Sequence, residues 1–125
     1  MKAVLVDSDI LIEVFRARDH SILAKWSGVS QNETMIVYSP VSVAELWHGV
    51  LPHEQKRLTD LFAAMTCIPI DAQTGRRAGD FLRQYAKSHH LDLGDALIAA
   101  TASIHKVALW TRNRRHYPMK DIAFY

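Results

Sequence analysis

The chain has 125 residues, which is enough for one domain to bury a core without disulfides or a structural metal. With 49% hydrophobic and 22% charged residues, the composition is that of a globular protein and excludes a disordered chain. The net charge of +2 permits a polyanionic partner without requiring one. Every apolar run is too short for a signal peptide or a membrane span, so we expect a cytoplasmic protein without a membrane partner.

Short, continuously apolar runs predict strands that are buried in a mainly parallel sheet. In chain order these strands are residues 3–6, 35–38, 66–70 and 107–111, with 122–125 as a fifth candidate. The single cysteine, Cys67, is expected to be buried in the third strand, and its isolation fits a reducing compartment.

Between these runs, apolar residues recur at spacings of three and four, which predicts amphipathic helices. The pattern is carried by Ile10, Leu11, Val14 and Phe15, by Ile22, Leu23 and Trp26, and by Ala78, Phe81, Leu82 and Tyr85. Ser39-Pro40, Leu51-Pro52 and Asp71 mark further helix starts. Strands that alternate with helices predict right-handed crossovers and a sheet covered on both faces, so the fold class is α/β.

The first unusual carboxylate is Asp7, which follows strand 3–6 at the end where open α/β sheets bind ligands. Its structural alternative is the N-cap of the next helix, a common role for Asp. Asp9 adds a second carboxylate, but we expect a spacing of two residues on a helix to point the two side chains apart.

Glu45 interrupts an apolar segment and has no partner nearby in the sequence. A capping box with Ser42 is the structural alternative, but Ser39-Pro40 starts the helix one turn earlier, so we favour a functional role. Asp92 is predicted to be an N-cap. Asp95 begins a run of small apolar residues typical of a central helix, so its carboxylate is expected to face the ligand crevice.

Asp7, Glu45 and Asp95 are all expected to point into or beside the core, where unpaired carboxylates are costly. Two unit charges about 4 Å apart repel by on the order of 4 kcal/mol at an effective dielectric of 20, against a typical domain stability of about 5–15 kcal/mol. A divalent cation removes this repulsion, and an all-oxygen site suits Mg²⁺ or Mn²⁺. Zinc is poorly supported because the histidines lack ligand spacing.

Further polar groups follow strand 107–111. Thr111 is placed to donate a hydrogen bond to a bound water, and Asn113 is either a turn residue or a site residue. Arg112, Arg114 and Arg115 are candidates for phosphate contacts, with solvated surface positions as the alternative.

Four segments together resemble the PIN-domain ribonucleases of the VapC type, which are toxins of type II toxin–antitoxin pairs. They are Val6-Asp7-Ser8-Asp9-Ile10, Ser42-Val43-Ala44-Glu45-Leu46, Asp95-Ala96-Leu97-Ile98-Ala99-Ala100-Thr101-Ala102 and Leu109-Trp110-Thr111-Arg112-Asn113. The resemblance covers essentially the whole chain. It implies one PIN-like domain over residues 1–125, with three α/β/α layers around a short, mainly parallel sheet.

The resemblance also implies an Mg²⁺- or Mn²⁺-dependent endoribonuclease that hydrolyses phosphodiester bonds of single-stranded or loop RNA. Asp7 and Asp95 would be direct metal ligands, Glu45 the third acid, and Glu45 and Asp92 secondary metal contacts. Asn113 stands at a fourth family position that is often Asp. By the same resemblance, the protein forms a homodimer and is inhibited by a cognate antitoxin protein.

Three alternatives remain open. A PIN-like module can bind RNA or protein without cutting. A response-regulator receiver domain would use Asp71 as its phosphorylated residue, although it needs a strand where residues 76–87 predict a helix. A haloacid-dehalogenase-like phosphatase would use Asp7 and Asp9, but the later Asp that this fold needs is replaced by Ala99.

Overall fold

The computed structural model describes residues 2–125, so Met1, the first residue of the predicted domain, lies outside the described residues. Four parallel strands form the sheet in the order β3-β2-β1-β4. Their bounds are β1 Ala3–Val6, β2 Met35–Tyr38, β3 Thr66–Cys67 and β4 Ala108–Trp110. In the register of the central strand, Val4 pairs with Ile36 on one side and with Ala108 on the other.

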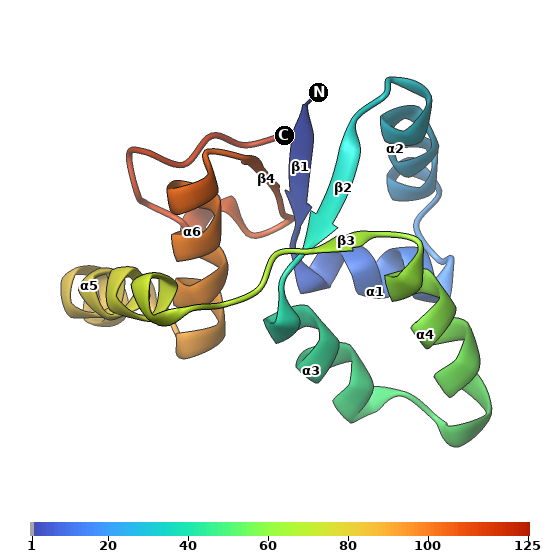
Figure 1. The fold of residues 1–125 in the computed structure, drawn as a ribbon, viewed down its shortest axis with the longest axis horizontal. Coiled ribbons are helices and arrows are strands. Elements are labelled where there is room, and N and C mark those ends of the chain that lie inside the picture. The colour runs from blue at the N-terminus through green and yellow to red at the C-terminus, as the bar shows by residue number, and fades with distance from the viewer. Residues whose placement is uncertain (1) are drawn as a thin grey trace.

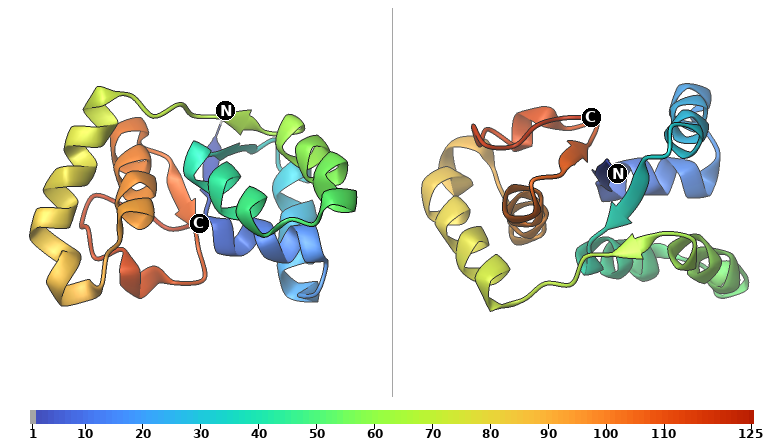
Figure 2. Two further views of the ribbon diagram at one scale, coloured as in Figure 1. Left: turned by 90° about the horizontal axis from the view of Figure 1, so that it is seen from below. Right: turned by 45° about the horizontal axis from the view of Figure 1, so that its top comes forward.

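Helices lie on both faces of this sheet (Figures 1 and 2). Their bounds are α1 Ser8–Arg16, α2 His20–Gln31, α3 Pro40–Gly49, α4 Gln55–Ala63, α5 Ala72–His89 and α6 Leu93–His105, with short 3₁₀ turns η1 Pro52–Glu54 and η2 Arg114–His116. The helices α5 and α6 cover one face, and α1 to α4 lie on the other side. The predicted three-layer α/β/α architecture is confirmed.

Strand β1 is apolar along its whole length because helices cover both of its faces. Val4, Leu5 and Val6 are all fully buried. Leu5 packs into the core cluster under α5 and α6, whereas Val4 and Val6 pack into the cluster under the other helices. Because successive side chains point to opposite faces of a strand, a strand covered on both faces has no polar positions.

The sheet is shorter than predicted at its edges. Strand β3 contains only Thr66–Cys67, and the predicted strand 122–125 contributes a single bridge between Phe124 and Leu109. Cys67 is exposed, so the prediction of a buried cysteine is wrong. The reason is position: β3 is the outermost strand beside β2, and a strand of two residues gives little cover to its side chains.

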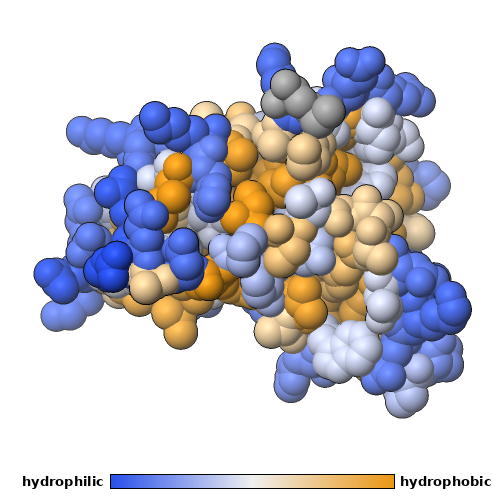
Figure 3. All heavy atoms as spheres, in the orientation of Figure 1, coloured by the Kyte–Doolittle hydropathy of each residue, from blue (hydrophilic) through white to orange (hydrophobic). Residues whose placement is uncertain are grey.

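The helix starts predicted at Ser39 and Asp71 are confirmed. Ser39 caps α3 by accepting from the Val41 amide, and Asp71 caps α5 by accepting from the Thr74 amide. Leu51-Pro52 starts the 3₁₀ turn η1, and α4 begins after it at Gln55. In α6, Ala96 and Ile98 to Ala102 are buried, so this helix is central, as predicted. Hydrophilic residues gather over α5 and α4 at the two sides of the molecule, with hydrophobic residues between them (Figure 3). Within residues 2–125, no helix combines the length and apolar character that crossing a membrane requires.

Candidate metal and nuclease site

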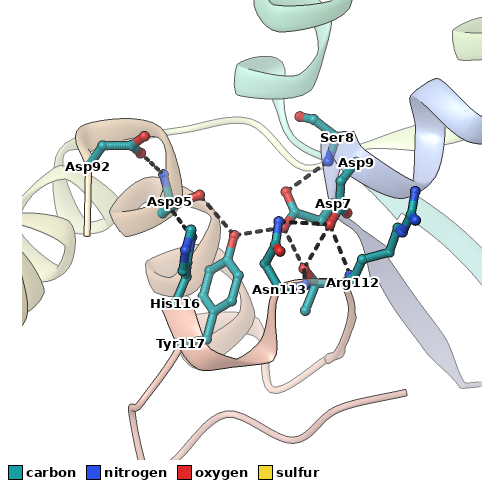
Figure 4. Close-up of polar contacts among 10 residues, drawn as sticks. Asp7, Ser8, Asp9, Asp92, Asp95, Arg112, Asn113, His116 and Tyr117 are labelled. Carbon is teal, nitrogen blue, oxygen red and sulfur yellow. Dashed lines mark hydrogen bonds and ion pairs between the residues drawn. The ribbon is translucent and has the colours of Figure 1, made fainter. Parts of the chain in front are cut away.

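The candidate site lies at the carboxyl ends of the neighbouring strands β1 and β4 (Figure 4). Asp7 directly follows β1, and its backbone amide donates to the Trp110 carbonyl of β4 at 2.9 Å. Thr111 directly follows β4. Parallel pairing therefore places these two residues side by side at one edge of the sheet, and the first turn of α6 contributes Asp95 to the same place.

Asp7 is both a helix cap and the centre of the polar cluster. It is buried, with 6% of its surface exposed. Its Oδ1 accepts from the Ser8 amide at 2.8 Å. Its Oδ2 accepts from the Thr111 hydroxyl at 2.9 Å and from the Tyr117 hydroxyl at 2.8 Å. The predicted cap and the predicted site role therefore coexist in one side chain, because the two oxygens face different partners.

Asp9 joins the same cluster, so the prediction that it points away from Asp7 is wrong. Its Oδ2 accepts from the Arg112 amide at 2.9 Å and lies 3.4 Å from the same Thr111 hydroxyl that binds Asp7. The helical spacing rule does not apply, because Asp7 is the N-cap and has extended backbone angles of φ −72° and ψ 159°. Burial, followed by the charge of Asp7, raises the pKa of Asp9 to about 6.

Asp95 faces Asp7 from the other side of Tyr117. Its Oδ1 lies 3.2 Å from the Tyr117 hydroxyl, and its Oδ2 lies 3.5 Å from Nδ1 of His116. Burial raises the pKa of Asp95 to about 6, and the charges of Asp92 and Asp7 add to this effect. Asp92 has the predicted capping role, since its Oδ1 accepts from the Asp95 amide at 2.8 Å.

Glu45 is exposed, so of the two predicted placements, into the core or beside it, the first is wrong. The buried face of α3 is occupied by Ser42 and Leu46, and Glu45 lies at the edge of that face. The Ser8 hydroxyl donates to Glu45 Oε1 at 2.7 Å and lies 2.8 Å from the Ser42 hydroxyl. Because the Ser8 amide binds Asp7, a single residue connects Glu45 to the central acid.

The remaining predicted residues surround the acids. Asn113 donates through Nδ2 to Asp9 Oδ2 at 3.3 Å. The three arginines extend toward different neighbours: Arg112 pairs with Glu13 at 3.4 Å, Arg114 stacks on the Phe124 ring, and Arg115 lines a hollow beside His89 and His90 at the end of α5. The structure therefore spreads this basic segment around the site instead of gathering it at one point.

The chemistry of this cluster fits a divalent cation. It offers carboxylate oxygens, which Mg²⁺ and Mn²⁺ prefer as ligands. Among residues 2–125, the one buried side-chain polar atom without a hydrogen-bond partner is Oδ1 of Asp9. Burial raises the pKa of Asp9 and of Asp95, and the nearby Arg112 and His116 do not offset this effect. In the same described residues, however, no three acidic, histidine or cysteine side chains already converge as a complete ligand set.

Sequence reasoning missed Ser8, His116 and Tyr117 and gave Asp9 no role in the site. Ser8 and Asp9 lie in the segment that carries the resemblance, so proximity to Asp7 was an available signal. His116 directly follows Arg115, in a basic segment for which the sequence predicts phosphate contacts or solvated surface positions. Tyr117 carries no local signal, because only the path of the chain after η2 brings its hydroxyl to Asp7.

Comparisons with known proteins agree with this arrangement. The model of the PIN domain family matches residues 4–124. The chain is 40% identical over 121 residues to Ribonuclease VapC10 of Mycobacterium tuberculosis, an alignment that covers 93% of this chain and 86% of that protein.

Two solved structures share the fold. The crystal structure of VapBC2 from Rickettsia felis bound to a promoter DNA fragment has a TM-score of 0.81 at 18% identity, covering 98% of this chain and 97% of that one. A toxin–antitoxin complex from Klebsiella pneumoniae has a TM-score of 0.78 at 22% identity, covering 96% and 95%.

The two alternative folds are set aside by these findings. A receiver domain needs a strand within the span that α5 occupies, and Asp71 serves here as the cap of that helix. A haloacid-dehalogenase-like phosphatase is a different fold from the one that matches. The family match, the relative at 40% identity and the architecture together show that the chain belongs to the PIN-domain family, with VapC proteins among its relatives.

Proposed function

We propose that this protein is a divalent-metal-dependent endoribonuclease that cleaves single-stranded or loop RNA as the toxin of a toxin–antitoxin pair. The observation that carries the proposal is the position of Asp7 at the carboxyl edge of the sheet, where it shares the Thr111 hydroxyl with Asp9 and the Tyr117 hydroxyl with Asp95. The 40% identity to a protein named a ribonuclease supports the reaction class.

In this proposal, Asp7 and Asp95 hold Mg²⁺ or Mn²⁺, and the unpartnered Oδ1 of Asp9 provides a further acidic oxygen beside them. When bound, the ion supplies Lewis-acid activation of water and stabilises negative charge on the phosphate. Glu45 is held by Ser8 and acts from the rim of the site, and Asp92 orients the first turn of α6. Asn113 supports the acids by donating to Asp9.

The flanking cations would bind the RNA backbone. Arg112 and Arg115 leave the same segment in different directions, toward α1 and toward the end of α5. Guanidinium groups spread in this way suit phosphates on both sides of a scissile bond, because each phosphate of an extended strand is displaced from the next. We assign the same supporting role to Arg114, and we assign Thr111 to fixing Asp7.

We also propose a cognate antitoxin and a homodimer as the partners of this chain. The structure that shares this fold in Klebsiella pneumoniae is a toxin–antitoxin complex, which supports the antitoxin. Leu93 is 62% exposed and lines a hollow with Val41, Ala44 and Leu97 beside Glu45, which supports a protein contact next to the site. The single cysteine fits a reducing compartment such as the cytoplasm.

The test is cleavage of a structured RNA mixture by purified, antitoxin-free protein in Mg²⁺, in Mn²⁺ and in EDTA. Wild type should cleave with either metal and stop in EDTA, and Asp95→Asn should lose activity. Asp80→Asn is the matched control, because Asp80 is exposed on α5. Equal cleavage by wild type and Asp95→Asn would contradict the proposed site. Metal binding without cleavage of any RNA would favour a non-catalytic binding module.

A further inference from the structure

Tyr117 stands between two acids that come from distant parts of the chain. It is 2% exposed, and its ring belongs to the core cluster under α5 and α6. Its hydroxyl lies 2.8 Å from Oδ2 of Asp7 and 3.2 Å from Oδ1 of Asp95. The ring is therefore held by packing, while the hydroxyl emerges at the point where the end of β1 meets the start of α6 (Figure 4).

We infer that Tyr117 is a positioning residue whose hydroxyl sets the orientation of Asp7 and its spacing from Asp95 for metal binding. This inference rests on the proposed function and names no contact between Tyr117 and RNA or metal. The hydroxyl acts through the two carboxylates, both of which it contacts directly. In metal sites, such partners of the ligands fix the ligand orientation, and their removal typically weakens binding about 10–100-fold.

The donor count on Asp7 supports this role. A phenol has one proton to donate, and the shorter contact assigns that donation to Asp7. Oδ2 of Asp7 then accepts from both Tyr117 and Thr111, while Oδ1 accepts from the Ser8 amide. A carboxylate has about four acceptor positions, so three donors fix the group from three directions and leave one position for a cation.

The hydroxyl is the part of Tyr117 that reaches the two acids, at 2.8 Å from Oδ2 of Asp7 and 3.2 Å from Oδ1 of Asp95. A purely structural role needs only the aromatic ring, which phenylalanine would supply equally well, and a buried hydroxyl without partners is costly.

The test compares Tyr117→Phe with wild type, since this variant removes the hydroxyl and keeps the ring. Calorimetric titration of the protein alone with Mn²⁺ should show affinity about tenfold weaker in the variant. The Mn²⁺ concentration for half-maximal RNA cleavage should rise by a similar factor, with activity largely recovered at saturating Mn²⁺. Tyr85→Phe is the matched control, because Tyr85 lies on α5 and packs on Phe81 and His89 away from the acids, so its Mn²⁺ affinity should be unchanged.

Two results would overturn the inference. Equal Mn²⁺ affinity in wild type and Tyr117→Phe would remove the positioning role, and tighter binding by the variant would mean that the hydroxyl competes with the metal. Failure of the proposed function is separate: wild type that binds Mn²⁺ but cleaves no RNA would refute the nuclease, while the affinity comparison would still decide the role of Tyr117.

A measurement on wild type avoids dependence on the folding of the variant. The Tyr117 hydroxyl proton, assigned in protein with labelled tyrosine, should stay protected from water when Mg²⁺ saturates the site. A proton that begins to exchange rapidly on Mg²⁺ addition would contradict the inference, because the hydroxyl would then have left its carboxylate partner.

Discussion

Asp71 and Asp7 both precede a helix and cap it, yet their surroundings differ. Asp71 is exposed, and hydrogen bonds from the amide and hydroxyl of Thr74 lower its pKa. Asp7 is buried and shares its neighbourhood with Asp9 and Asp95, each with a pKa raised to about 6. Both carboxylates accept from a backbone amide of the helix that they cap, Asp71 from Thr74 and Asp7 from Ser8, so the main difference between them is in solvent exposure and neighbouring charge.

The comparison extends to other carboxylates. The pKa of Asp19 and that of Asp121 are also lowered, the first mainly by Ser21 and the second mainly by Ser103. These groups are satisfied by hydrogen bonds at the surface. The acids at the carboxyl edge of the sheet lack such full compensation, and this distinguishes a candidate ligand from a structural cap.

The largest expected effect is a loss of RNA cleavage when Asp7 is replaced, with little loss when Asp71 is replaced. Asparagine caps helices as well as aspartate, so Asp7→Asn should keep the start of α1 while it removes a metal ligand. RNA cleavage should fall by at least about 100-fold, since removing a ligand should cost no less than removing one of its outer partners. Asp71→Asn should remain within about twofold of wild type. Comparable losses in both variants would erase the distinction between the two caps.

The second effect is the increase in folding stability that metal binding should produce. Mn²⁺ at a free concentration 100 times its dissociation constant should raise the free energy of unfolding by about 2.7 kcal/mol, and EDTA should reverse this gain. Thermal or urea unfolding of wild type and Asp7→Asn measures it, and the variant should gain much less. If Mn²⁺ stabilises both proteins equally, the ion binds elsewhere.

The third effect is the pH dependence of the metal-free protein. The pKa values of Asp9 and Asp95 rise from 3.8 to about 6 on folding, so the folded state binds protons more tightly in this range. Their contribution to stability is fully present below pH 3.8 and is lost as pH rises through about 6.

Urea unfolding should therefore show about 1–2 kcal/mol more stability near pH 4 than near pH 6, after allowance for partial exposure of both groups. Asp95→Asn should show a smaller difference. The lowered pKa of Asp71 has the opposite sign: its contribution is present above its unfolded value of 3.8 and is lost as pH falls through its folded pKa. A wild-type stability that rises from pH 4 to pH 6 would contradict the assignment.

The smallest effect tests the structural cap alone. Asp71→Ala removes the acceptor for the Thr74 amide, so the free energy of unfolding should fall by about 1 kcal/mol. Metal affinity and RNA cleavage should not change, because Asp71 lies outside the acidic cluster. A loss of Mn²⁺ affinity in this variant would show that the two regions are coupled.

The local features of this protein could be predicted from its sequence. Ser39, Asp71 and Asp92 cap the helices that they were predicted to start, because a cap depends on an amide two or three residues away. The apolar runs predicted the central strands, because a strand that is buried on both faces has no polar position and its own residues show this. The edge strand β3 was predicted too long, because its length depends on a neighbour and not on its own composition.

The site itself combines both kinds of information. Asp7 and Asp95, the main acids of the candidate site, could be singled out from the sequence as carboxylates next to apolar elements. Only the tertiary structure decided that Asp9 turns toward Thr111, that Glu45 lies on the surface, and that Tyr117 stands between the acids. These contacts join residues far apart in the chain, so they depend on strand register and helix packing, which no local pattern of residues encodes.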